Sequence, residues 1–192
     1  AYKLRSFGIG VQEDVAGTTA VLGTLKGGKP GPVIAWRAEM DALPMTEGTD
    51  LPFASNFVGK MHACGHDGHM SILLGAAEVL SQVKDDIPGT VVFICQPSEE
   101  KSPGGGAKGL VASGVLDGVD AVYGLHVWPT LPSGKIGVLP GPMMAASDHI
   151  RIVLNGKASH AAMPHKGVDT IVAAAQFLTA AQTIISRRVN PL

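Results

Sequence analysis

Three short, wholly apolar runs constrain the fold of this chain more than any other feature of its sequence. They occupy residues 33–36, 91–95 and 121–125, and none of them alternates between apolar and polar positions. Such runs are typical of β-strands that are buried on both faces, as in parallel sheets covered by helices. An apolar repeat of three and four residues predicts a helix that starts at Asp67, and a shorter helix is expected at 107–113. The order strand, helix, strand, helix, strand predicts an α/β fold with a largely parallel sheet flanked by helices.

Two further expectations concern another strand and the start of the long helix. Residues 18–25 form another β-rich run, which a turn-forming cluster at 26–31 separates from the first apolar strand. Asp67 is a residue type that favours the N-cap position, so we expect it to cap the long helix.

The pattern changes after Pro142, where we expect a domain boundary that divides the chain into residues 1–141 and 142–192. Residues 148–154 alternate between apolar and polar positions, which predicts a half-exposed strand, and a helical repeat covers 168–187. One strand and one helix cannot bury their apolar faces alone. The second domain is therefore expected to be incomplete.

Charge and composition exclude several classes of partner. The chain has 15 Lys and Arg against 16 Asp and Glu, a net charge of -1, so it lacks the basic field that nucleic acids and anionic membranes select. No segment reaches the roughly 18 apolar residues of a membrane span. The start does not resemble a signal peptide, and two cysteines in different contexts favour a reducing compartment. We therefore expect a cytoplasmic protein that binds neither nucleic acid nor membranes.

The densest chemistry lies at residues 62–69, which hold three histidines, a cysteine and an aspartate where a loop meets a helix. In open parallel sheets, ligands bind at this edge. Cys64 and His66 can converge on one cation because Gly65 lets the backbone bend between them. A thiolate and an imidazole suit Zn²⁺, Co²⁺ or Mn²⁺ better than Mg²⁺ or Ca²⁺. The alternative is a buried structural cysteine beside helix-capping polar residues, and so many donors together favour the metal.

Two other predicted strands also end at potential ligands. Glu99 and Glu100 follow the second apolar strand, where one carboxylate can bind a metal while the other takes a proton from metal-bound water. The alternative is a solvated acidic loop. His126 ends the third strand. We interpret Cys95 as a core residue, and His160 and His165, taken alone, as surface histidines. The donors at the strand ends suggest a ligand set of Cys64, His66, Glu100 and His126.

Four motifs appear in order along the chain. They are RAEMDALP at 37–44, MHACGHDGH at 61–69, QPSEE at 96–100 and GKASHAAMPH at 156–165. Together they closely resemble the M20 metallopeptidase superfamily, in its amidohydrolase branch of hippurate hydrolases, N-acyl-amino-acid deacylases and auxin-conjugate hydrolases. The resemblance covers essentially the whole chain.

The resemblance implies a fold and an activity. It implies a zinc-peptidase-like α/β catalytic domain, here residues 1–141, and part of an inserted α+β lid domain that also dimerises, here residues 142–192. It implies hydrolysis of the amide bond of an N-acyl amino acid by a homodimer that binds two divalent ions per subunit, Mn²⁺, Zn²⁺ or Co²⁺.

The resemblance also implies roles for single residues. Glu99 matches the general base of the family, and Asp41 matches the acidic residue that orients a metal ligand. His160 matches a lid histidine that stabilises the oxyanion on the substrate carbonyl. The residues that match the metal ligands of the family are Cys64, His66, Glu100 and His126.

Three departures from the family pattern qualify these expectations. Glu39 stands where the family usually has Asp, and we expect a mild effect. The last metal ligand of the family, a histidine, has no counterpart before Leu192, and the N-terminal helix region of the family is short here. The chain is therefore expected to be about the middle half of a family member, and an inactive fragment is one alternative.

Two other functions compete with the metal hydrolase. Cys64 could be a nucleophile with His62 or His66 as its base, which leaves Glu99, Glu100 and His126 without roles. The chain could also be a non-catalytic descendant that binds a metal or ligand. Glu99 argues against that alternative, because a protein that only binds has no use for a free base beside the metal.

Overall fold

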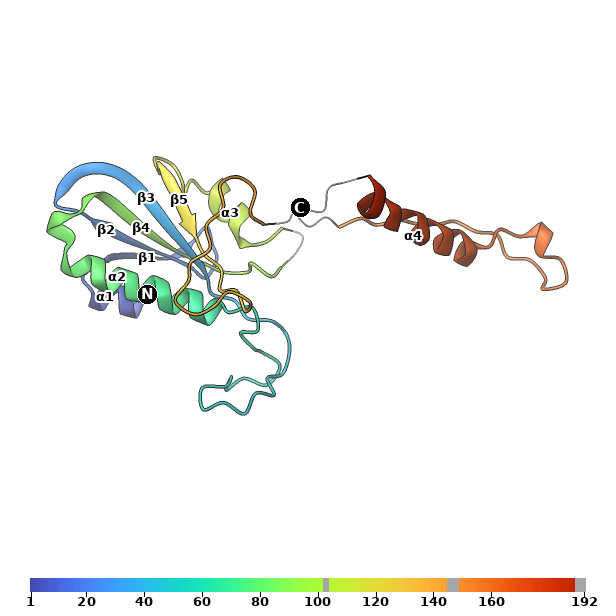
Figure 1. Cartoon of the computed structure of the whole chain (residues 1–192), viewed down its shortest axis with the longest axis horizontal. Helices are drawn as coiled ribbons and strands as arrows, with labels where there is room; N and C mark the ends of the chain where they lie inside the picture. Colours follow the sequence, from blue (N-terminus) through green and yellow to red (C-terminus); the bar gives the residue numbers. More distant parts are fainter. Residues whose placement is uncertain (102–103, 145–148, 189–192) are drawn as a thin grey trace. The chain divides into compact units, whose positions relative to one another are not determined.

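The computed structural model describes residues 1–101, 104–144 and 149–188 of the chain (Figure 1). The chain divides into two compact units, Ala1–Leu139 and Pro140–Leu192, and each is described by itself. The first unit is an α/β sheet with helices, which confirms the predicted fold class. The assignment of the two units to a catalytic domain and a lid domain stays a prediction. Among the described residues, no helix combines the length and the apolarity that a membrane span requires.

The first unit is built around a mixed sheet of five strands in the order β1-β2-β4-β3-β5. The central strand β3 is parallel to both β4 and β5, whereas β1 and β2 extend the sheet as antiparallel strands. Its elements are α1 (Tyr2–Ser6), β1 (Gly10–Val15), β2 (Ala20–Lys26), β3 (Lys29–Glu39), α2 (His66–Gln82), the short 3-10 helix η1 (Lys84–Asp86), β4 (Pro88–Gln96), α3 (Gly106–Ala112) and β5 (Ala121–Gly124).

Helices cover both faces of this sheet (Figure 1). On one face, Leu73 of α2 packs in a core with Leu4 of α1 and Phe93 of β4, and all three side chains are fully buried. On the other face, Leu110 of α3 packs with Ile94 and its neighbours. Because β4 contributes to both cores, it carries the unbroken apolar run that its sequence shows.

The parallel strands bring their carboxyl ends to one edge of the sheet. Glu39 of β3 lies opposite Gln96 of β4, and Arg37 of β3 lies opposite Gly124 of β5. Because this register is fixed by backbone pairing, the residues that follow each strand meet at the same edge.

Two details of the first unit differ from the sequence expectations. The strand β1 was not predicted, because its polar residues Gln12, Glu13 and Asp14 hide any alternation. Asp67 is not the N-cap of α2. The helix begins at His66 with Gly65 as its N-cap, and the amide of His69 donates to the Gly65 carbonyl oxygen (3.0 Å). Asp67 instead lies in the first turn, where a carboxylate favours the helix dipole.

The second unit contains the predicted long helix but not the predicted strand. The helix α4 (Thr170–Arg187) follows a 3-10 turn η2 (Pro164–Lys166), and Asp169 caps it by accepting from the amides of Ile171 and Val172. Residue 148 lies outside the described residues, and residues 149–154 form no strand. A strand needs a partner for its backbone groups. The described part of the second unit offers only an isolated bridge between Lys157 and Val168.

Candidate metal centre

The predicted donors follow the carboxyl ends of three neighbouring strands. Asp41 follows β3, Glu99 and Glu100 follow β4, and His126 follows β5. A backbone hydrogen bond also joins the ends of β3 and β4, because the amide of Met40, just after β3, donates to the carbonyl oxygen of Gln96, the last residue of β4 (2.8 Å).

Two unusual backbone conformations aim these donors. Gly65 has a φ of +85°, in the left-handed region that favours glycine, and it turns the chain between Cys64 and His66. A Cβ at this position would lie 2.4 Å from Cγ2 of Val127, so no larger residue fits. After β4, Ser98 has a φ of +57° and starts the turn that presents the two glutamates. A serine in this region is strained, and strained non-glycine residues cluster at functional sites.

The structure brings the predicted ligands together in what we call the open cluster, Cys64, His66 and Glu100. One potential ligand atom from each of these residues lies within 4.8 Å of the others. His126 adjoins the open cluster, because its Nε2 lies 3.4 Å from Sγ of Cys64.

Hydrogen bonds fix the tautomers of both histidines. Nδ1 of His66 donates to the carbonyl oxygen of Asp41 (2.9 Å), and Nδ1 of His126 donates to that of Val127 (2.6 Å). Because a carbonyl oxygen can only accept, the proton of each neutral ring lies on Nδ1. Each Nε2 therefore keeps a lone pair that faces the open cluster, as a metal-binding histidine requires.

The open cluster contains buried acceptors without donors. Nε2 of His66 and Oε1 of Glu100 are buried without a hydrogen-bond partner among the described residues, and they lie 3.9 Å apart. Oδ1 of Asp41 likewise accepts no hydrogen bond from any residue that the structure describes. Buried polar atoms of folded proteins nearly always have partners, and facing lone pairs repel each other. A bound cation would satisfy His66 and Glu100 together, so the residues present fit a metal ion.

The two adjacent glutamates occupy different environments. The side chain of Glu99 is 39% exposed and that of Glu100 is 26% exposed. Oε2 of Glu99 lies 3.8 Å from Nε2 of His66, so it borders the open cluster from the solvent side. Both carboxylates lie near His66, but only Glu100 also lies close enough to Cys64 to belong to the open cluster.

Asp41 contacts two residues of the open cluster. Its Oδ2 accepts from the amide of Glu100 (2.9 Å), and its Oδ1 lies 3.4 Å from Nδ1 of His66. Burial raises the pKa of Asp41, but the backbone hydrogen bonds from Glu100 and Glu99 outweigh burial, so the pKa lies below its usual 3.8. Asp41 is therefore a carboxylate that holds both of these residues in place.

The Cys64 thiol is not activated as a nucleophile. Burial and the nearby Glu100 carboxylate raise the pKa of Cys64 to about 11. Reactive cysteines have the opposite environment, which lowers the thiol pKa. The raised pKa disfavours the cysteine-hydrolase alternative, whereas binding of a dication would deprotonate the thiol.

The sequence analysis missed a second group of residues, which we call the closed cluster: Arg37, Glu39 and His69. Nδ1 of His69 donates to Oε2 of Glu39 (2.8 Å), and Arg37 forms an ion pair with Oε1 of Glu39. Nε2 of His69 accepts from the amide of Val127 (3.0 Å). His69 follows His66 by one helical turn, and this spacing was the signal in the sequence that could have identified it.

Glu39, His66 and His69 also lie close enough to form a metal-binding group. However, both nitrogens of His69 already have partners, and each carboxylate oxygen of Glu39 already accepts from His69 or Arg37. His69 therefore has no lone pair to offer, and a cation would have to compete with these two donors for Glu39. Burial raises the pKa of Glu39, but the hydrogen bond from His69 and the charge of Arg37 outweigh burial, so the pKa lies below its usual 4.5.

The remaining candidates lie away from the open cluster or outside its unit. Cys95 is buried in the core, and burial raises its pKa to about 11. His62 is exposed. His160 and His165 belong to the second unit, where Nδ1 of His160 accepts from the amide of Ala162 (3.2 Å). The predicted role of His160 stays a prediction.

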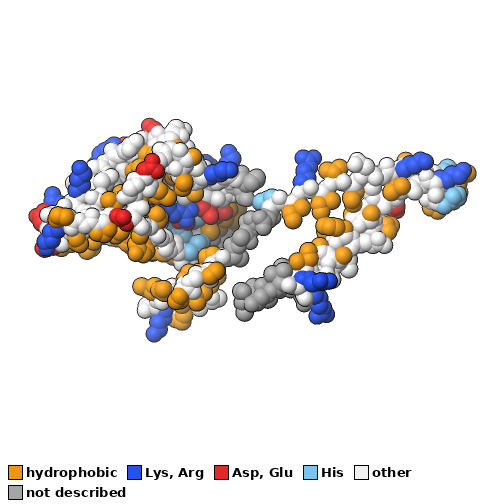
Figure 2. Space-filling model, turned by 90° about the horizontal axis from the view of Figure 1, so that it is seen from above, with side chains coloured by type: hydrophobic (Ala, Val, Ile, Leu, Met, Phe, Trp, Pro, Cys, Tyr) orange, Lys and Arg blue, Asp and Glu red, His pale blue; other side chains and the backbone are white. Residues whose placement is uncertain are grey.

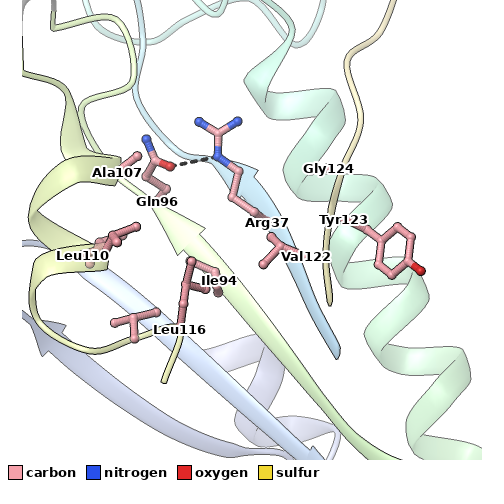
Figure 3. Close-up of a pocket in the computed structure, with 11 residues that line it drawn as sticks. Arg37, Ile94, Gln96, Ala107, Leu110, Leu116, Val122, Tyr123 and Gly124 are labelled. Atoms are coloured by element: carbon pink, nitrogen blue, oxygen red, sulfur yellow. Dashed lines mark hydrogen bonds between the residues drawn. The ribbon is translucent and has the colours of Figure 1, made fainter. Parts of the chain in front are cut away.

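A separate cavity of about 230 Å³ lies where α3 faces β4 and β5 (Figure 3). Its walls are mainly apolar, with Ile94, Leu110 and Val122 among them. At its polar end, Nε of Arg37 donates to Oε1 of Gln96 (2.8 Å). None of the residues predicted for the metal site lines this cavity.

Sequence comparisons connect this site to known proteins. The sequence pattern of peptidase family M20/M25/M40 matches residues 35–190. The chain is 52% identical to an N-acyl-L-amino acid amidohydrolase of Geobacillus stearothermophilus over 91% of this chain and 47% of the relative. The chain spans about half the length of the curated relatives it matches.

Comparisons with solved structures agree with the sequence comparisons. A protein of methicillin-resistant Staphylococcus aureus described as an aminohydrolase matches with a TM-score of 0.82 and 41% identity, over 100% of this chain and 52% of that chain. The YXEP protein of Bacillus subtilis, a dinuclear metal-binding peptidase of the M20 family, matches with a TM-score of 0.69 and 46% identity. That match covers 73% of this chain and 39% of that chain.

Proposed function

Because the chain belongs to peptidase family M20/M25/M40, we propose that it carries the metal-binding part of an enzyme that hydrolyses the amide bond of N-acyl amino acids. One observation carries this proposal. Two buried acceptors, Nε2 of His66 and Oε1 of Glu100, face each other beside the Cys64 thiol, and neither has a hydrogen-bond partner among the residues that the structure describes. A divalent cation is the partner that such a set of donors selects.

We propose that the ligands contributed by this chain are Cys64, His66, Glu100 and His126. Sulfur, nitrogen and oxygen donors together suit Mn²⁺, Zn²⁺ or Co²⁺. We propose two ions per subunit in the complete enzyme, by analogy with the dinuclear metal-binding peptidase that the chain resembles. When bound, such ions lower the pKa of a coordinated water to about 7 and polarise a carbonyl group.

The residues of the chain then supply proton transfer and orientation. Glu99, beside the open cluster and half in solvent, accepts the proton of the attacking water and later delivers it to the departing amine. Asp41 holds His66 and Glu100 through its carbonyl and carboxylate oxygens. We assign His160 of the second unit to stabilising the oxyanion on the substrate.

The name of one relative supports the substrate class. The amidohydrolase of Geobacillus stearothermophilus acts on N-acyl-L-amino acids, and the chain is 52% identical to it. We propose benzoyl-glycine and acetyl-amino acids as substrates of the present protein.

We also propose that the complete protein is a homodimer through the second unit. Side chains on α4 support this, because Ile171 is 79% and Leu178 is 61% exposed. Figure 2 shows hydrophobic side chains on the surface of the second unit. Apolar surface of this kind marks association sites. Sedimentation that finds a monomer would contradict the dimer without affecting the proposed reaction.

The test is an amidase assay with benzoyl-glycine and a panel of acetyl-amino acids, with Mn²⁺, Zn²⁺ or Co²⁺ added and with or without chelator. It uses the 192-residue chain and, beside it, the product of the gene read from its natural start codon to its stop codon. We expect release of free amino acid that the chelator abolishes. Metal binding without turnover on any substrate would favour the non-catalytic descendant.

Substitution of Glu99 tests the assigned base. Glu99→Gln keeps the size of the side chain but cannot take a proton, so kcat should fall by about 10²–10⁴-fold while metal content is unchanged. Glu78→Gln, on the exposed side of α2, is the matched control and should change neither quantity. A Glu99→Gln enzyme with normal kcat would remove Glu99 from the mechanism.

A further inference from the structure

His69 is fully buried beside the open cluster and has a single possible arrangement of its ring proton. The amide of Val127 can only donate, so Nε2 of His69 must accept and Nδ1 must carry the hydrogen that Glu39 accepts. Both nitrogens are therefore used, and His69 has no lone pair left for a cation. Its contribution to the site must therefore come through its two hydrogen-bond partners or through the packing of its ring against His66 and His126.

Val127, one of these partners, is fixed from two directions. Its amide is bound by His69, and its side chain lies so close to Gly65 that a Cβ there would be 2.4 Å from Cγ2 of Val127. Gly65 and His69 both belong to the N-terminal turn of α2. This turn therefore holds the chain that follows β5 by a hydrogen bond and by packing.

Val127 in turn orients the ring of His126. The Val127 carbonyl oxygen accepts from Nδ1 of His126 (2.6 Å), which leaves Nε2 of His126 facing Sγ of Cys64 at 3.4 Å. The rings of His69 and His126 also pack edge to face, with centroids 4.7 Å apart. A displacement of the Val127 backbone would therefore move Nε2 of His126 away from Cys64.

The other partner of His69 anchors this arrangement in the sheet. Glu39 at the end of β3 accepts from His69 and pairs with Arg37, and Arg37 in turn donates to Gln96 of β4. These contacts join the ends of β3 and β4 to the chain that follows β5. A buried phenylalanine would fill the same space without making any of these bonds, so packing alone does not explain a histidine at this position.

We propose that His69 is a positioning residue, which holds the Val127 backbone and thereby places the ring of His126 beside Cys64. The consequence for metal binding rests on the proposed function, whereas the hold on Val127 does not. Residues that orient metal ligands in this way affect metal affinity by about 10–100-fold.

Two conservative substitutions separate the two bonds of His69. The side-chain amide of His69→Gln reaches the position of Nε2 and can accept from Val127, whereas that of His69→Asn reaches only the position of Nδ1 and can bind Glu39. If His69 acts through Val127, glutamine should preserve the site better than asparagine does. The matched controls are His62→Gln and His62→Asn, at an exposed histidine of the same segment.

The first measurement is hydrogen exchange of the Val127 amide in the metal-free 192-residue chain. Exchange should be roughly 3- to 10-fold faster in His69→Asn than in wild type, and close to wild type in His69→Gln and in both controls. Equal exchange in His69→Asn and wild type would overturn the proposal.

The second measurement is titration with Co²⁺, followed by the absorption band of a cobalt–thiolate bond. The Co²⁺ dissociation constant should rise by about 10–100-fold in His69→Asn and much less in His69→Gln. Equal rises in the two variants would overturn the proposed route through Val127. A wild-type chain that binds no Co²⁺ would defeat the proposed function, while the exchange comparison would still decide whether His69 holds Val127.

A third measurement needs no variant and so survives a failure of the variants to fold. In ¹⁵N-labelled wild-type chain, a hydrogen bond from Val127 to Nε2 of His69 should produce a scalar coupling between the two nitrogens. Its presence, with the His69 proton on Nδ1, supports the proposal, and its absence with a proton on Nε2 contradicts it.

Discussion

Two clusters of polar side chains share the carboxyl edge of the sheet, and they differ in whether their atoms have partners. In the closed cluster, both oxygens of Glu39 and both nitrogens of His69 are hydrogen-bonded or ion-paired. In the open cluster, Nε2 of His66 and Oε1 of Glu100 are buried and have no hydrogen-bond partner within the part of the chain that the structure describes. Proximity of metal-binding residue types is therefore not enough to identify a metal site. The candidate metal site is the group in which potential ligand atoms still have lone pairs available for a cation.

Removal of Glu39 should have the largest effect on the metal-free chain. Glu39→Ala leaves the Nδ1 proton of His69 and the Arg37 guanidinium without their acceptor. Because Glu39 is almost fully buried, we expect a loss of about 3 kcal/mol in the free energy of unfolding, measured by urea denaturation. Glu78→Ala is the exposed control and should change it by less than about 0.5 kcal/mol. An equally small change in Glu39→Ala would show that the closed cluster is not held by these bonds.

The same glutamine substitution should have opposite signs in the two clusters. Glu100→Gln gives the open cluster a donor that can reach Nε2 of His66, so it should stabilise the metal-free chain by about 1 kcal/mol while it weakens metal binding. Glu39→Gln turns an amide donor toward Arg37 or His69, so it should destabilise. Urea denaturation without metal measures both. Destabilisation by Glu100→Gln would mean that the charge of Glu100 and its hydrogen bond with the Cys64 thiol stabilise the metal-free chain more than the new bond to His66 does.

Acid should remove the stabilisation by the closed cluster. The pKa of Glu39 is lowered in the folded chain, so its contribution to stability is complete above its usual pKa of 4.5 and is lost as pH falls through the folded value. Between roughly pH 5 and pH 3, the stability of Glu39→Gln should therefore fall less steeply than that of wild type. Parallel curves of unfolding free energy against pH would contradict the assignment of an ionised Glu39.

The sequence predicted the open cluster because its members have a local signal. Glu100 and His126 each follow an unbroken apolar strand, and Cys64 and His66 flank a glycine before a helical repeat. The fold class followed from the same strands. Parallel pairing then brings the strand ends together without further information.

The closed cluster has a weaker signal, the one-turn spacing of His66 and His69, because its contacts depend on register and on where a helix begins. Glu39 meets His69 only when α2 starts at His66, and an N-cap at Asp67 would have placed His69 differently. Val127 is a plain apolar residue in the sequence, and its role lies in its backbone amide. The strand expected at 148–154 does not form over its described residues, 149–154, for a related reason, because strand formation depends on a partner that no local pattern reveals.

The most direct test of the open cluster as the metal site is anomalous diffraction from crystals of the chain grown with Co²⁺. We expect an anomalous peak within bonding distance of Sγ of Cys64, Nε2 of His66 and a carboxylate oxygen of Glu100, with His69 still bound to Glu39. A peak on His69 and Glu39 would contradict the comparison of the two clusters. A chain without bound cobalt at saturating concentration would contradict the metal site itself.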